Sequence, residues 1–135
     1  MKILFVCSGN TGRSPMAEFV MKKLVAGDKN FVIESAASKP TEGGELHEGI
    51  AAKLREENVP YTKHIARQIT AADYEKFDKI ICMDSGNVEQ VKNICGGDPS
   101  NKIQMLLETD IPWDKNGFAK TYDDILRGCQ ALLKG

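Results

Sequence analysis

The residues of this chain best suited to chemistry lie near its N-terminus, in the segment Cys7-Ser8-Gly9-Asn10-Thr11-Gly12-Arg13-Ser14-Pro15. An apolar run, Ile3–Val6, precedes the segment and is typical of a buried strand. A helix is predicted to follow, with Ser14 as its N-cap and Pro15 at its first position. A thiol, a loop of small residues and an arginine therefore lie between the end of a strand and the start of a helix.

Such a loop is suited to binding a phosphate-like dianion. Its backbone N–H groups turn inward, and the positive end of the helix dipole lies behind them. The same field stabilises a thiolate, which makes Cys7 a candidate nucleophile, and the planar fork of Arg13 can hold two oxygens at once. Together these features predict phosphoryl transfer through a phosphocysteine.

The elements that must position this loop alternate along the chain. Strand patterns cover Lys2–Val6, Phe31–Ile33, Phe77–Met83 and Lys102–Leu106, and helix patterns cover Pro15–Ala26, Leu46–Glu57, Ser85–Cys95 and Phe118–Leu133, with a short helix opening at Thr70. This order predicts one α/β domain over residues 1–135, with a four-stranded parallel sheet and helices on both faces. Ligands of such sheets bind beyond the carboxyl ends of the strands, where the loop after the first strand lies.

Composition narrows the class of protein. The net charge of −1 argues against a general nucleic-acid binder, and no apolar run approaches the length of a membrane span. The cysteines are scattered without a CxxC pair or zinc-like spacing, so we expect neither a disulfide framework nor a metal site; they are Cys7, Cys82, Cys95 and Cys129. We expect a cytoplasmic monomer with reduced thiols, in which the cysteines after Cys7 are buried apolar residues.

The loop resembles the signature of the low-molecular-weight protein tyrosine phosphatases, and the similarity extends over essentially the whole chain. Cys-x5-Arg followed by Ser-Pro, with Gly9-Asn10 inside it and a strand before it, is a specific pattern. Further matching stretches are Glu34–Ala37, His64–Gln68, Phe77–Asn87 and the C-terminal part from Pro112-Trp113 to Gly128-Cys129.

The resemblance implies roles for individual residues. Cys7 would attack phosphorus, while Arg13 and the loop N–H groups hold the phosphate oxygens and Ser14 donates a hydrogen bond to the thiolate. The phosphate-binding residues would be Ser8, Gly9, Asn10, Thr11, Gly12 and Ser14. Asn10, Ser35 and His64 would brace the loop, Asp84 would support its arginine, and Trp113 would form a wall of the substrate cleft. No cofactor or metal is implied, and the substrates would be phosphorylated proteins or small phosphomonoesters.

Two positions depart from the family pattern. Gly12 stands where members usually carry a second cysteine that forms a protective disulfide with the nucleophile, so we expect no such redox lock here. The family's general acid is the Asp of an Asp-Pro pair, and a gapless match places Ile111 there. Asp110 lies one residue earlier and Asp114 follows Trp113. We predict Asp110 as the general acid, because a loop absorbs a shift of one residue more easily than a larger rearrangement.

Three other functions compete with a tyrosine phosphatase. Thr11 resembles relatives that act on phosphoarginine, where tyrosine-directed members tend to carry Ile. A thioredoxin-coupled arsenate reductase uses the same loop, but needs two further cysteines arranged as a relay, and Cys82 and Cys95 lie a helix apart. A weakly active module that only binds phosphorylated ligands would explain Gly12 and Ile111.

Overall fold

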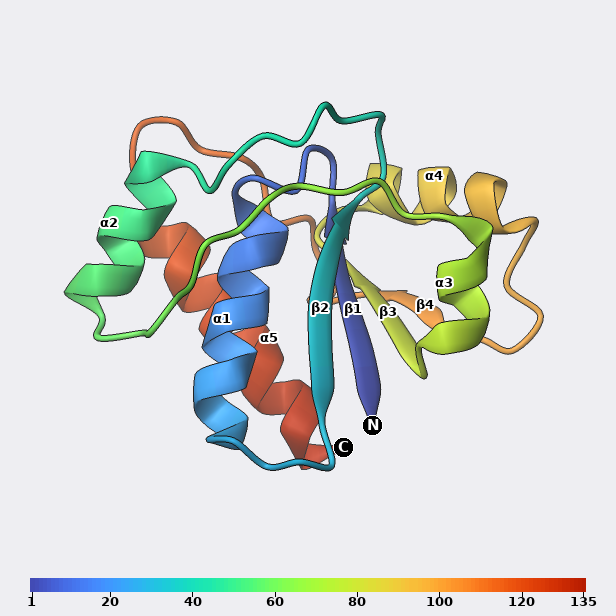
Figure 1. Ribbon diagram of the computed structural model, residues 1–135, viewed down its shortest axis with the longest axis horizontal. Helices are drawn as coiled ribbons and strands as arrows, with labels where there is room; N and C mark the ends of the chain where they lie inside the picture. The colour runs from blue at the N-terminus through green and yellow to red at the C-terminus, as the bar shows by residue number, and fades with distance from the viewer.

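A computed structural model describes all residues from Met1 to Gly135 and contains one parallel sheet (Figure 1). The strand order is β2-β1-β3-β4, and the strands are β1 (Lys2–Cys7), β2 (Val32–Ala37), β3 (Lys79–Cys82) and β4 (Ile103–Met105). The central strand β1 pairs with β2 on one side and β3 on the other, and Cys7 lies opposite Ala37. The predicted sheet is confirmed.

Helices cover both faces of the sheet. In Figure 1 α1 (Arg13–Val25), α2 (Glu48–Glu56) and α5 (Ala119–Lys134) lie to one side, and α3 (Ala71–Lys76) and α4 (Ser85–Cys95) lie to the other. Alternate residues of β1 belong to two separate hydrophobic cores. Ile3, Phe5 and Cys7 lie in the core on the α1 face of the sheet, and Leu4 and Val6 lie in the core on the α3 face. This period of two is expected of a strand buried on both faces.

The start of α1 differs from the prediction. The N-cap is Gly12, not Ser14, and the first helical hydrogen bond runs from Met16 N to Gly12 O at 3.1 Å. Ser14 lies inside the first turn because its hydroxyl is engaged with Cys7 and Asn10 rather than with a backbone N–H of the helix. The predicted N-cap was therefore wrong.

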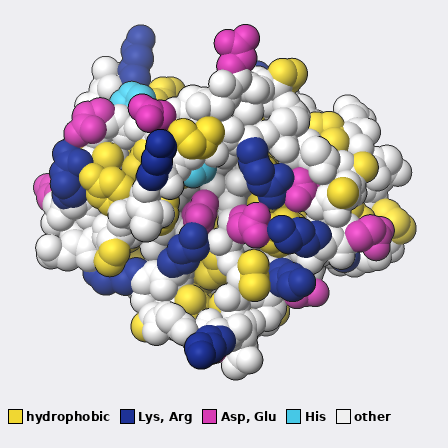
Figure 2. Space-filling model, in the orientation of Figure 1, with side chains coloured by type: hydrophobic (Ala, Val, Ile, Leu, Met, Phe, Trp, Pro, Cys, Tyr) yellow, Lys and Arg dark blue, Asp and Glu magenta, His cyan; other side chains and the backbone are white.

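The surface carries charges of both signs. Figure 2 shows Lys and Arg side chains interspersed with Asp and Glu across the face it presents, with no broad patch of one sign. None of the helices combines the length and the apolar character needed to cross a bilayer. The structure contains no group of three or more His, Cys, Asp or Glu side chains placed to hold a metal ion.

Candidate active site

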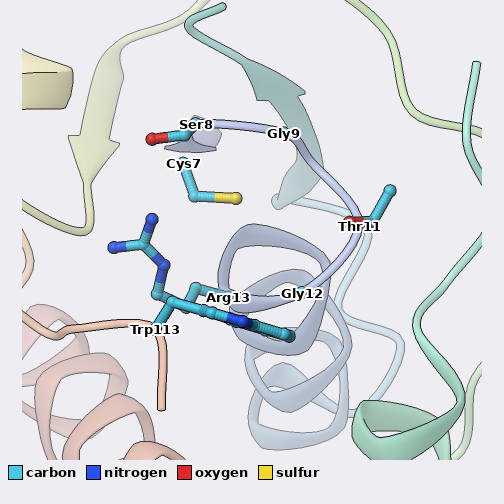
Figure 3. Close-up of a pocket in the computed structure, with 7 residues that line it drawn as sticks. All are labelled: Cys7, Ser8, Gly9, Thr11, Gly12, Arg13 and Trp113. Carbon is cyan, nitrogen blue, oxygen red and sulfur yellow. The ribbon is translucent and has the colours of Figure 1, made fainter. Parts of the chain in front are cut away.

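The loop between β1 and α1 forms the floor of a slot with a volume of about 300 Å³. Its lining consists of Cys7, Ser8, Gly9, Thr11, Gly12, Arg13 and Trp113. In Figure 3 the loop curves around the Cys7 sulfur, with the Arg13 guanidinium on one side of it and the Trp113 ring along Gly12 and Arg13. The slot therefore lies at the carboxyl end of β1 and at the N-terminus of α1, where an anion is favoured.

The sulfur of Cys7 is paired with a hydroxyl. Cys7 Sγ lies 3.0 Å from Ser14 Oγ, and both residues are buried. A thiolate can only accept a hydrogen bond, so the hydroxyl is the donor whenever Cys7 is ionised. Such a bond stabilises the anion both as a nucleophile and as a leaving group.

Asn10 holds the strained part of the loop. Its φ of 56° is left-handed, which costs a non-glycine residue energy unless the surroundings impose it. Its amide Nδ2 donates to Ser14 Oγ at 2.8 Å and to Ser35 Oγ at 3.0 Å. Its Oδ1 accepts from Arg67 N at 3.1 Å, and its backbone oxygen lies 2.7 Å from His64 Nε2. The structure thus brings Ser35 and His64 together on Asn10.

Arg13 is anchored through one of its terminal nitrogens. Nη1 donates to Asp84 Oδ2 and to Ile111 O, each at 2.8 Å, and the residue is only 6% exposed. No other hydrogen bond within the protein holds the guanidinium, so Nη2 and Nε keep their protons for a ligand. Asp84 also accepts from Asn87 N at 2.8 Å as the N-cap of α4, which fixes its carboxylate at the carboxyl end of β3.

Neither candidate acid lines the slot. Asp110 is exposed, and its two carboxylate oxygens accept from Ser85 N at 2.9 Å and from Ser85 Oγ at 3.4 Å. Asp114 is also exposed and accepts from Asn116 N at 2.9 Å. Ile111, between them, is fully buried, with its N–H bonded to Met83 O. The structure gathers most of the residues predicted to bind phosphate around the slot but leaves both carboxylates outside its lining.

Trp113 lies directly against Gly12. A Cβ added to Gly12 would come within 2.3 Å of Trp113 Cζ3, so only glycine leaves room for the ring as it stands. The ring also contacts His47 and Phe118, with centroid distances of 5.1 Å to each. Trp113 is 42% exposed, and the contacts place its ring along one wall of the slot.

Comparisons with known proteins agree with this geometry. A model of the family "Low molecular weight phosphotyrosine protein phosphatase" matches residues 2–135. The chain is similar to the phosphatase of that name from Mus musculus, at 35% identity over 147 residues, covering 98% of this chain and 93% of the mouse protein. The chain belongs to the low molecular weight phosphotyrosine protein phosphatase family.

Solved structures of family members superpose closely on this phosphatase. The low molecular weight protein tyrosine phosphatase from Streptococcus pyogenes gives a TM-score of 0.92 at 40% identity, covering 98% of this chain and 91% of that one. YfkJ from Bacillus subtilis gives a TM-score of 0.93 at 31% identity, covering 99% and 92%. The resemblance inferred from the loop is confirmed over the whole fold.

Two residues that contact the site of this phosphatase, Glu18 and His47, were not predicted from the sequence. Glu18 is buried and accepts from Ser35 Oγ at 2.6 Å; its position four residues after Ser14 puts both on one face of α1, which is the signal that could have identified it. His47 is exposed, but it is also the N-cap of α2, and its backbone N–H donates to Thr11 O at 2.8 Å. Nothing in the sequence around His47 indicates that contact with the loop.

The other cysteines of this phosphatase are poor candidates for redox chemistry. Burial raises the pKa of the Cys129 thiol to about 12, and burial also raises the pKa of Cys82. Cys95 is half-buried at the end of α4, and burial raises its pKa as well. No disulfide links any of the cysteines. A relay of thiolates, as an arsenate reductase needs, has no support in this arrangement.

Proposed function

We propose that the tyrosine phosphatase activity of this family runs, in this chain, through a phosphocysteine on Cys7. The observation that carries the proposal is the slot itself, because Cys7, Arg13 and most of the loop residues between them line one cavity. In the first step the Cys7 thiolate forms a bond to phosphorus while the bond from phosphorus to the tyrosine oxygen breaks.

Arg13 and the loop N–H groups bind the equatorial oxygens of the phosphoryl group in this step. Their donors are fixed before the substrate arrives, so they stabilise the transition-state charge without reorganising. Asp84 and Ile111 O hold Nη1 of Arg13, which leaves the opposite edge of the guanidinium for the phosphate. Ser14 donates to the sulfur and stabilises it again when the thiolate departs in the second step.

Asp110 is our candidate for the general acid. It would protonate the leaving oxygen, then take a proton from the water that attacks phosphocysteine and releases inorganic phosphate. Its main chain adjoins Ile111, whose carbonyl accepts from Arg13, so the segment is tied to the phosphate-binding arginine. The role requires the carboxylate to leave Ser85 during the reaction, since its hydrogen bonds there hold it outside the slot.

The proposed substrate is phosphotyrosine in a protein or peptide. An aromatic ring can lie against Trp113 while its phosphate reaches the loop floor beside Cys7. Thr11 also lines the slot and is the feature that favours phosphoarginine as the alternative. Turnover on matched phosphotyrosine and phosphoarginine peptides, for wild type and Thr11→Ile, tests the choice. We expect the tyrosine peptide to be preferred by wild type; preference for phosphoarginine that Thr11→Ile reverses would contradict the proposal.

We further propose that the enzyme acts as a monomer in the cytoplasm. All four cysteines are free thiols in the structure, which suits a reducing compartment. Gel filtration at the concentrations used for assays tests the monomer: a dimer that retains full activity would contradict it.

A further inference from the structure

Glu18 is a buried carboxylate for which the mechanism above has no role. It lies on α1 with 9% of its surface exposed, next to β2 and one turn beyond Ser14. Its Oε1 accepts from Ser35 Oγ and its Oε2 from Lys22 Nζ, each at 2.6 Å. Burying a carboxylate is costly unless specific partners satisfy it, so its position requires a reason.

The bond to Ser35 starts a chain of hydrogen bonds that ends at the catalytic sulfur. A carboxylate can only accept, so the Ser35 hydroxyl proton points to Glu18 and a lone pair of Ser35 Oγ faces Asn10. That lone pair accepts one proton of Asn10 Nδ2, and the second proton of Nδ2 goes to Ser14 Oγ.

The last link concerns the direction of the Ser14 hydroxyl. Because Ser14 Oγ already accepts from Asn10, its own proton is available for Cys7 Sγ, 3.0 Å away. If the Asn10 amide were turned over, its oxygen would face both serines and would attract the Ser14 proton away from the sulfur. A Ser35 hydroxyl that has lost its acceptor at Glu18 can donate to Asn10 and thereby favours the turned amide.

We propose that Glu18 is a positioning residue, whose carboxylate fixes the hydrogen-bond direction from Ser35 through Asn10 to Ser14 and so directs the Ser14 proton to Cys7. This inference rests on the proposed function, in which Cys7 is the nucleophile. The amide is secured at two ends, by Glu18 through Ser35 and by Arg67 N on Asn10 Oδ1. Lys22 neutralises the carboxylate from the solvent side, with 47% of its own side chain exposed.

A purely structural role for Glu18 is the competing explanation. In that case the Glu18–Lys22 contact would be an ordinary pair one helical turn apart, contributing a little to helix stability. The chain provides a matched control in Asp124 of α5, which is 7% exposed and accepts from Lys120 Nζ at 2.6 Å, also one turn away. Asp124 has no hydrogen bond to the loop, so its replacement removes burial and pairing without touching the chain of bonds.

The test compares Glu18→Ala, Glu18→Gln and Asp124→Ala with wild type. The rate of Cys7 alkylation by iodoacetamide, measured from pH 5 to 9, reports how well the thiolate is stabilised, and hydrolysis of p-nitrophenyl phosphate gives kcat and KM. We expect Glu18→Ala to slow alkylation at the acidic end by roughly tenfold, the size of one hydrogen bond to an ionised group. We expect the kcat of Glu18→Ala to fall together with its alkylation rate, while KM changes little, because phosphate binding by Arg13 is not affected.

Glu18→Gln keeps an oxygen that can accept from Ser35, so it is expected to retain the wild-type alkylation curve. Asp124→Ala should follow the wild-type curve as well. Ser35→Ala breaks the chain one link closer to Cys7 and keeps the test open if Glu18→Ala does not fold, as thermal melting would show. With wild type fully active, a folded Glu18→Ala whose alkylation curve coincides with that of wild type overturns the role of Glu18; if Glu18→Ala does not fold, a wild-type curve for Ser35→Ala does so. A wild type without Cys7-dependent turnover overturns the proposed function instead.

Discussion

The two loops that meet at the slot are held in different ways. The loop from Cys7 to Ser14 is fixed from several directions, through the side chain of Asn10, the backbone N–H of Arg67, and the hydroxyls of Ser14 and Ser35. The segment around Trp113 is anchored mainly at Ile111, by Met83 O and Arg13 Nη1, and beyond it residues 112–116 are exposed.

The two loops are held differently because they have different tasks in the proposed mechanism. In that mechanism the first loop holds donors for the phosphoryl group, which requires a geometry that is set before the substrate binds. In the same proposed mechanism the second loop delivers a proton and contacts the rest of the substrate, which requires a carboxylate able to change partners. We therefore expect mutations in the second loop to affect proton transfer and substrate choice, and mutations around the first to affect phosphate binding and the thiolate.

The largest effect on the second loop is expected at Asp110. Asp110→Asn should lower kcat for p-nitrophenyl phosphate and for a phosphotyrosine peptide by about 10²–10⁴-fold, the usual contribution of a general acid or base. Asp114→Asn, a matched change four residues later, should leave kcat near the wild-type value. The reverse ranking of the two variants would show that the proton donor is Asp114.

A smaller effect is expected from loosening the arginine of the first loop. Asp84→Asn removes the charge that pairs with Arg13 and keeps one side-chain oxygen, which can accept either from Arg13 Nη1 or from Asn87 N at the start of α4, but not from both. We expect kcat/KM to fall by about 10- to 100-fold, because a hydrogen bond between charged groups contributes about 1.5–3 kcal/mol. Competition by inorganic phosphate gives the affinity, which should weaken in parallel; unchanged phosphate affinity would contradict the role of Asp84.

Gly12→Ala tests the contact between the two loops directly. The added Cβ would displace the Trp113 ring, and Trp113 is the only tryptophan in the chain, so its fluorescence reports the movement. We expect a red-shifted emission and a change of a few-fold in KM for aryl phosphates, the scale of a small change in an apolar pocket. Gly9→Ala is the control in the same loop, since its Cβ would meet only Thr11 Oγ1 at 3.9 Å. Identical spectra for Gly12→Ala and wild type would show that Gly12 does not position the ring.

The smallest effect is expected on the stability of the protein at acidic pH, and it concerns Asp73. Asp73 pairs with Arg67, whose backbone N–H donates to Asn10. Burial acts to raise the pKa of Asp73, but hydrogen bonds from Arg67 and Thr70 outweigh it and leave the pKa below its usual value. Because the folded-state pKa is depressed, this stabilisation is present above about pH 4, the unfolded value, and is lost as the pH falls through the folded-state pKa. Urea unfolding should show Asp73→Asn less stable than wild type at pH 7, with the gap narrowing toward pH 2. A constant gap would contradict the assignment.

The same contrast explains what the sequence could predict. The Cys7–Ser14 loop was predictable because its parts are contiguous: an apolar strand, small residues, an arginine and a helix start. The position of the Asp110 carboxylate was not, since it depends on Ser85, a partner 25 residues away on another element. Glu18 and the N-cap at Gly12 were missed for a related reason: the hydrogen bonds of Ser14 and Ser35, rather than helix propensity, decide both.

The measurement that tests the central claim most directly is a rapid-quench reaction of wild type with p-nitrophenyl phosphate. Acid quenching followed by peptide mapping locates any phosphate bound to the protein, and Cys7→Ser serves as the control. We predict a burst of p-nitrophenol stoichiometric with enzyme, a phosphorylated peptide modified at Cys7, and no p-nitrophenol release by Cys7→Ser. Turnover without phosphate on Cys7, or full activity of Cys7→Ser, would contradict the account.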